Sequence, residues 1–211
     1  MGNAGALRLF DQLAEEQRQQ LTDRFAERHK TFADCTTAMR ETIRTLQQRG
    51  WQIHENIWTA CLFVNLVAHD LSILIFDLAY ERDEWRRRFI ARSIALVLYE
   101  IAEDIPAVLG KNFQEALTIL AVPDKLQANL RSAQKVVTNF WSSNRKLLNE
   151  IRVVSAAHRD HDAMTQLDVI DQIDPLEILR LGLELGNSLN ILGAQAQAII
   201  TQTSNTRPPE G

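Results

Sequence analysis

The residues best suited to chemistry lie in one stretch, NEIRVVSAAHRDHDAMTQLDVIDQID, which covers residues 149–174. Hydrophobic burial accounts for the aliphatic residues of this stretch, but not for Arg152, His158 and His161. An imidazole exchanges protons near neutral pH, and a guanidinium presents a planar fork of donors to oxyanions. Arg152 and His158 are therefore the first candidates for acid–base and phosphate chemistry.

Helical spacing decides whether Arg152 and His158 can meet. The apolar stripe through Ile151 and Val154 extends by four residues to His158, so this histidine points toward a core or an interface. Six residues at about 100° each separate the two side chains by about 120° around a helix. They converge on one ligand only if the helix ends near His158 or a second subunit closes the cleft. The other interpretation is a core histidine paired with a carboxylate, beside a solvated arginine.

The sequence HRDHD also has the spacing of a metal site. His158, His161 and Asp162 stand at positions i, i+3 and i+4, which share one face of a helix. Binuclear sites in helical bundles draw carboxylates and paired Glu-x-x-His motifs from several helices, and no such motif occurs in the chain. We therefore predict no metal and no other cofactor.

His69 and Asp70 form a second pair of interest, because adjacent His and Asp ligands are typical of HD-type phosphohydrolases. Such a site also needs an upstream histidine, which here is His54 or His29, and a downstream aspartate that the sequence does not identify. His69 shares a polar stripe with Asn65 inside an apolar segment. We predict a buried core histidine that is satisfied by hydrogen bonds.

Composition sets the broad class of protein. The chain has 211 residues, of which 45% are hydrophobic and 24% are charged, values that are ordinary for one soluble globular domain. The net charge of −4 gives no bulk attraction to nucleic acid, so such binding needs a local basic patch. The two cysteines, at positions 35 and 61, exclude a scaffold of several disulfides. We predict a single domain over residues 1–202 and a disordered tail over residues 203–211.

Helical periodicity runs through the whole chain, and no alternating pattern typical of a strand is present. The sequence therefore predicts an all-α bundle of five to seven helices. Gly50 ends the first helix or pair of helices, Pro106 kinks the third or starts a new turn, and Asp174 caps the last before a proline and a glutamate. Asp124 is the expected N-cap of the long helix that contains Arg152.

The segment over residues 57–80 is apolar enough to suggest a membrane span. It contains Asp70 and Asp77, and an aspartate at the bilayer centre costs about 2.5 to 3.5 kcal/mol on insertion scales. We therefore predict a buried core helix with internal polar contacts, in a cytoplasmic protein that makes no membrane contact.

The stretch LNEIRVVSAAHRDHD, preceded by the helix RRRFIARSIALVLYEIAEDI and followed by a capped amphipathic helix, resembles the HEPN superfamily of all-α proteins. The signature of that superfamily is an arginine, four to six residues and then a histidine, late in a helical bundle. In this sequence the two residues are Arg152 and His158, with five residues between them. The resemblance spans roughly residues 86–200 in layout, and its specific part is these two residues and their spacing.

This resemblance implies a metal-independent ribonuclease of a toxin or phage-defence system. His158 would act as general base or acid at the 2′-hydroxyl or the leaving oxygen, and Arg152 would stabilise the charge of the phosphorane. Arg159 and His161 would bind substrate. Nuclease members commonly have a polar residue, often Asn, after the arginine, where this chain has Val153. The alternative is a non-catalytic helical interaction module, or the partner or neutralising subunit of such a system.

Two further features concern partners. Five arginines within residues 82–92, interleaved with acidic residues and Trp85, form either a contact for an RNA backbone or a solvated helix start with ion pairs between residues four apart. Gly182, Gly186 and Gly193 each cost about 1 kcal/mol relative to alanine in a helix, but they allow helices to approach closely. Together with the apolar segment they predict a homodimer. RNA and a protein partner are the other expected ligands.

Overall fold

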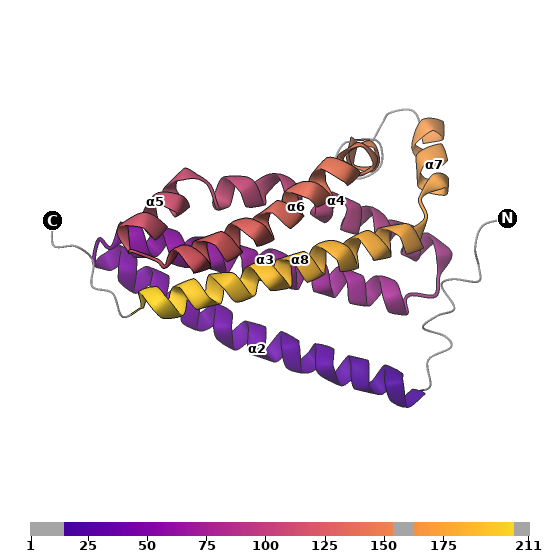
Figure 1. Ribbon diagram of the computed structural model, residues 1–211. Helices are drawn as coiled ribbons and strands as arrows, with labels where there is room; N and C mark the ends of the chain where they lie inside the picture. The colour runs from indigo at the N-terminus through magenta and orange to yellow at the C-terminus, as the bar shows by residue number, and fades with distance from the viewer. Residues whose placement is uncertain (1–14, 154–162, 205–211) are drawn as a thin grey trace.

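The computed structural model describes residues 15–153 and 163–204. These residues form seven α-helices and no strand (Figure 1), which confirms the predicted all-α bundle. The helices are α2 (Glu15–Gln48), α3 (Gln52–Tyr80), α4 (Glu84–Val108), α5 (Lys111–Ile119), α6 (Asp124–Ile151), α7 (Ala163–Gln172) and α8 (Pro175–Thr203).

Local residues explain where the helices begin and end. Gly50 follows α2 with a φ of 68°, a left-handed conformation that suits glycine and stops the helix, as predicted. Asp174 accepts a hydrogen bond from the Leu176 amide at 2.9 Å, which confirms it as the N-cap of α8. Asp83 caps α4 in the same way, because its carboxylate accepts from the Arg86 amide at 2.9 Å.

Two boundary predictions need correction, and one helix was not predicted. Pro123 is the N-cap of α6 and Asp124 already belongs to its first turn, because the helix begins directly after the extended proline (φ −55°, ψ 137°). α7 is a separate helix that the sequence analysis did not predict. Thr203 still belongs to α8, where it is 1% exposed and its hydroxyl donates to the Ile199 carbonyl. The predicted tail therefore starts too early, and its residues 205–211 lie outside the described residues.

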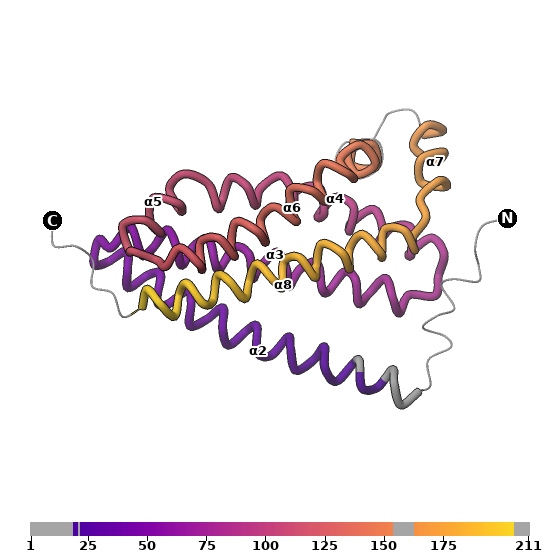
Figure 2. Tube along the Cα trace, viewed as in Figure 1, coloured from indigo at the N-terminus to yellow at the C-terminus, as the bar shows by residue number. Residues whose placement is uncertain are grey.

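The core lies where α8 packs against α3, α4 and α6. Figure 2 shows α8 running along the length of the bundle, between α6 and α2 in this view. Full burial of a leucine contributes about 1.5–3 kcal/mol relative to its exposure, so the inner face of α8 contributes strongly to the stability of the bundle. This face contains four leucines that are at most 1% exposed, namely Leu181, Leu185, Leu189 and Leu192.

Gly182 brings α8 and α3 close together. A Cβ atom at Gly182 would lie 3.1 Å from Cγ1 of Ile75, whereas a Cβ atom at Gly193 would meet nothing nearer than Oδ1 of Asn65, at 4.0 Å. The close approach that the glycines predict therefore occurs at Gly182, inside the bundle.

α3 is buried on one face only. Leu71 and Leu78 on its inner face are 0% exposed, but Leu66 is 37% exposed and only 28% of the most apolar 18-residue window of α3 is buried. The predicted core helix is thus less buried than expected, because α2 covers its outer face only in part. By length and composition α3 is the one described helix that meets the criterion for a membrane span, and core helices of soluble proteins meet the same criterion. The cytoplasmic location stays a prediction.

The two glycines give a matched test of the contact between α3 and α8. Gly193→Ala should raise the free energy of unfolding by about 0.5–1 kcal/mol, because alanine favours the helix and the position has room for a methyl group. Gly182→Ala should gain less, or lose stability, because its Cβ enters the space of Ile75. Urea unfolding of both variants measures the difference. Equal stabilisation by the two substitutions would contradict the close approach at Gly182.

Candidate functional site

Arg152 lies at the C-terminal end of α6, directly after the buried Ile151. The backbone widens into a π-helical turn at residues 152–153, a feature found frequently at functional sites. The guanidinium carbon of Arg152 lies 4.6 Å from the centroid of the Tyr99 ring on α4. Its Nε atom is buried and has no hydrogen-bond partner among the described residues. Because stacking uses the face of the guanidinium, the donors at its edge are left for an oxyanion.

A second arginine stacks on a second ring beside Arg152. The guanidinium of Arg145 lies 5.4 Å from the centroid of Trp141, and the Trp141 and Tyr99 rings meet edge to face, with centroids 4.8 Å apart and planes at 83°. Arg145 and Arg152 are seven residues apart, so they lie on the same face of α6, two turns from one another. Each such pair contributes about 0.5 to 2 kcal/mol, depending on its exposure. α6 therefore presents two cations, each positioned by an aromatic ring.

Of the four predicted site residues, the structure describes Arg152 alone. His158, Arg159 and His161 lie outside the described residues, so their convergence with Arg152 stays a prediction. α6 ends at Ile151, before His158 in the chain. Val153, at the position that is commonly polar in nucleases of the HEPN type, is 43% exposed and does not fill the core.

Two arginines in the first turns of α4, Arg86 and Arg88, form ion pairs. Arg86 lies 2.9 Å from the carboxylate of Glu81, and the Asp83 amide, which donates to that carboxylate, is the main cause of a lowered pKa of Glu81. Arg88 pairs with Glu84 one turn away, at 3.4 Å, and with Asp171 of α7 at 2.6 Å. The predicted ion pair between residues four apart is therefore confirmed for Arg88, which also ties α7 to α4.

Two aromatic side chains stand exposed beside this cluster. Trp85 is 52% exposed and Phe89 is 57% exposed, and the Arg92 guanidinium lies 5.5 Å from the centroid of the Phe89 ring. The two rings line a surface hollow of about 790 Å³ together with Arg82 and Arg86 and with the acidic Asp77 and Glu81. Exposed rings flanked by arginines are typical of surfaces on which the bases of a single strand stack.

His69 belongs to a separate cluster, where α2 crosses α3. Its Nε2 atom lies 3.0 Å from Nδ1 of His29, and its ring stacks on Phe32 with centroids 3.8 Å apart and planes 11° apart. His69 is 5% exposed and its Nε2 atom is hydrogen-bonded, which confirms the buried, hydrogen-bonded histidine, but its Nδ1 atom has no partner among the described residues. Of the two upstream histidines considered, His29 meets His69, whereas His54 lies fifteen residues away on the same helix, about 22 Å at 1.5 Å per residue.

This cluster differs from a typical metal centre. In the described part of the chain, no group of three or more His, Cys, Asp or Glu side chains has an arrangement that could hold a metal ion. The His29 and His69 nitrogens give two ligands, fewer than the three or four that protein zinc sites use. Burial raises the pKa of the Cys61 thiol to about 12, so this cysteine stays neutral near pH 7 and supplies no thiolate.

No protein-family model, no curated protein and no solved structure matches this chain. The interpretation of the site therefore rests on its residues and geometry. The sequence analysis missed Tyr99 and Trp141 as the partners of the arginines on α6. The available signal was the seven-residue spacing of Arg145 and Arg152, which places both on one helix face.

Acidification should weaken the attachment of α2 to α3. Burial lowers the pKa of His69, and the neighbouring His29 and Arg28 lower it further, against an opposing effect of Asp70. The unfolded chain binds a proton at this residue near pH 6.5, whereas the folded chain binds it only at lower pH. The unfolded state therefore binds more protons in this window, and stability falls as the pH drops below about 6.5.

We expect the urea midpoint of the wild type to be lower at about pH 5.5 than at about pH 7.5, and to change less in His69→Gln. His54→Gln serves as the control, because it replaces another buried histidine of α3 and leaves the His29–His69 contact in place. If the wild type and His69→Gln lose the same free energy of unfolding on acidification, the result contradicts the lowered pKa of His69.

Proposed function

We propose that this chain is an HEPN-like helical protein that binds RNA and cleaves it without a metal, with Arg152 and His158 as the reacting pair. The observation that supports this most is the guanidinium of Arg152, which is stacked on Tyr99 and has a buried Nε without a partner. A buried donor without an acceptor costs about 1–3 kcal/mol, and more when the group is charged. A phosphate group at the edge of this guanidinium would supply oxygen acceptors where the described residues supply none to Nε.

The proposed reaction uses the two residues in separate roles. As a neutral imidazole, His158 takes the proton of the 2′-hydroxyl; as a charged imidazole, it gives a proton to the leaving oxygen. Both forms are accessible near pH 7. Arg152 stabilises the additional negative charge of the phosphorane. Arg159 and His161 bind the adjoining substrate, and Arg145 extends the cationic face of α6.

The exposed aromatic rings of α4 support RNA as the ligand. Trp85, Phe89, Arg92 and Tyr99 follow one another at steps of four, three and seven residues, so they share one face of α4. From Trp85 to Tyr99 this face extends about 21 Å at 1.5 Å per residue. A single strand that follows α4 would stack bases on the exposed rings and bring a phosphate to Arg152. This path gives the local cationic surface that a chain with a net charge of −4 needs.

The second candidate is a non-catalytic helical interaction module. It is favoured by Val153, which occupies the position next to the arginine with an exposed aliphatic side chain. Exposed apolar residues on α8 also favour a protein partner, since Leu183 is 50% exposed and Ile191 is 54% exposed.

Cleavage of a mixed RNA pool in the presence of a chelator tests the proposal. His158→Ala should lower the cleavage rate about 10²- to 10⁴-fold, the usual contribution of general acid–base catalysis. Arg152→Lys should lower it as well, because a lysine keeps the charge but loses the planar fork. Arg131→Ala is the matched control, since it removes an exposed arginine elsewhere on α6.

The melting temperatures of the same variants separate the two candidates. Lost cleavage with an unchanged melt supports the ribonuclease. A wild type that binds no RNA and cleaves none, together with a destabilised His158→Ala variant, supports the interaction module and contradicts the ribonuclease.

The exposed side chains of α3 and α8 support a homodimer as the assembly. We expect light scattering at micromolar concentration to give twice the chain mass of 24.0 kDa. Ile191→Glu should shift the protein toward the monomer, because a carboxylate in an apolar interface loses its hydration. A wild-type mass equal to that of one chain would contradict the dimer.

A further inference from the structure

α2 does not lie flat on the bundle, and it leaves two adjoining cavities above the seam between α3 and α8. Their volumes are about 540 Å³ and about 330 Å³, within the range of roughly 300–1,000 Å³ in which proteins bind small molecules. We name the two cavities together the α2 groove. Both are lined by Arg24, Arg28, Ala68 and Asn190.

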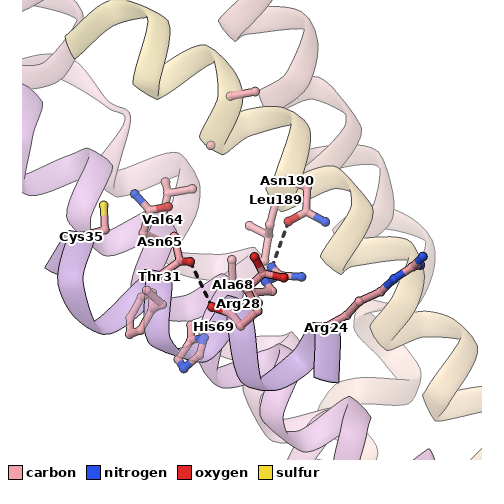
Figure 3. A pocket seen from close by; sticks show the side chains of 14 residues that line it. Arg24, Arg28, Thr31, Cys35, Val64, Asn65, Ala68, His69, Leu189 and Asn190 are labelled. Atoms are coloured by element: carbon pink, nitrogen blue, oxygen red, sulfur yellow. Dashed lines mark hydrogen bonds between the residues drawn. The ribbon is translucent and has the colours of Figure 1, made fainter. Parts of the chain in front are cut away.

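One hydrogen bond crosses the α2 groove where the cavities adjoin. Nη2 of Arg28 on α2 donates to Oδ1 of Asn190 on α8 at 3.2 Å (Figure 3). Both side chains are exposed, and the acceptor is a neutral amide. A carboxylate accepts from a guanidinium more strongly than an amide does, and it can accept two bonds at once. An anion that enters the groove can therefore replace Asn190 as the partner of Arg28.

The smaller cavity is lined mainly by apolar surface, with Arg24, Arg28, Ser72 and Asn187 among the polar residues of its lining. Phe25 of α2, Ile75 and Phe76 of α3, and Leu183 of α8 line it. Leu183 is 50% exposed, so this apolar surface is open to a ligand. Gly186 contributes no side chain to the floor, where a Cβ atom would still lie 3.9 Å from Cδ1 of Ile75. The floor of the cavity therefore has space for a ligand, and a larger side chain at position 186 would fill that space.

The larger cavity has polar groups along its walls. Asn65 and His69 of α3 line it together with Thr31 of α2, and Figure 3 shows Asn65 and His69 near Arg28. Nδ1 of His69 is buried and has no hydrogen-bond partner in the described chain. The residues that line the two cavities include one acidic residue, Glu27, and two arginines, Arg24 and Arg28. The charge of the groove therefore favours an anion.

We propose that the α2 groove binds a fatty acid. Its carboxylate pairs with Arg28 at the boundary between the cavities, and its alkyl chain fills the apolar cavity between Phe76 and Leu183. A fatty acid matches the groove because it needs one strong anionic contact and an unbranched apolar tract. This site is distinct from Arg152 and does not depend on the proposed ribonuclease.

Titration of the full chain with dodecanoate, followed by calorimetry, tests the proposal. We expect one dodecanoate per chain, and at least about tenfold weaker binding by Arg28→Ala, because charge-assisted hydrogen bonds are the stronger ones. Arg44→Ala is the matched control, since it removes an exposed arginine of α2 that does not line the groove. Gly186→Leu should abolish binding by filling the apolar cavity, and its melting temperature shows whether the variant is folded.

Three results would overturn the proposal. The first is no binding of dodecanoate to the wild type. The second is equal binding of dodecyltrimethylammonium, or an equal loss in Arg28→Ala and Arg44→Ala, since either result means non-specific surfactant adsorption. The third is binding to anionic phospholipid vesicles that depends on Arg28 and is as tight as binding to dodecanoate, because the ligand is then a membrane surface. Arg28→Ala should leave RNA cleavage unchanged, so the two proposals fail independently.

Discussion

The contact between Gly182 of α8 and Ile75 of α3 sets the spacing on which the rest of the bundle depends. With no side chain at Gly182, α8 lies close to α3, and its leucines reach the core that α4 and α6 complete. α2 then lies outside this core, over α3. Stacked rings hold it there, with Phe25 on Phe76 and Phe32 on His69. The groove between α2 and α8 follows from this arrangement, because α2 packs mainly on α3, and the hydrogen bond from Arg28 to Asn190 joins it to α8.

Five arginines of α4 and the C-terminal part of α6 divide into two kinds by their partners. Arg86 and Arg88 pair with carboxylates, which neutralises them and joins α4 to the preceding turn and to α7. Arg92, Arg145 and Arg152 stack on aromatic rings instead. A ring positions a guanidinium without cancelling its charge. A chain with a net negative charge can in this way keep a local cationic surface along α4 and α6.

The features that could be predicted from the sequence are those that local chemistry determines. Helical periodicity defines the all-α class, and Asp174 and Gly50 mark helix ends through contacts with residues nearby in the chain. The stacking of Arg152 on Tyr99 joins residues on different helices, so no local pattern shows it. The choice of His29 as the partner of His69 likewise depends on how α2 is placed along α3.

The burial of α3 shows the same limit. Its composition predicts an apolar helix correctly, but the share of its surface that is covered depends on the position of α2. The seven-residue spacing of Arg145 and Arg152 is enough to place Arg152, one of the predicted site residues, on the polar face of α6. The sequence had no means of showing that its guanidinium lies against a ring of α4.

The two cysteines differ in a way that makes the molecule convenient for spectroscopy. Cys35 is exposed on α2 at the edge of the groove, whereas Cys61 is buried and its burial raises the pKa of the thiol to about 12. Thiolates react with maleimides and thiols do so poorly, so a spin label or dye attaches to Cys35 alone in the folded native chain. The sequence thus offers a single labelling position from which the distance between two subunits can be measured without engineered cysteines.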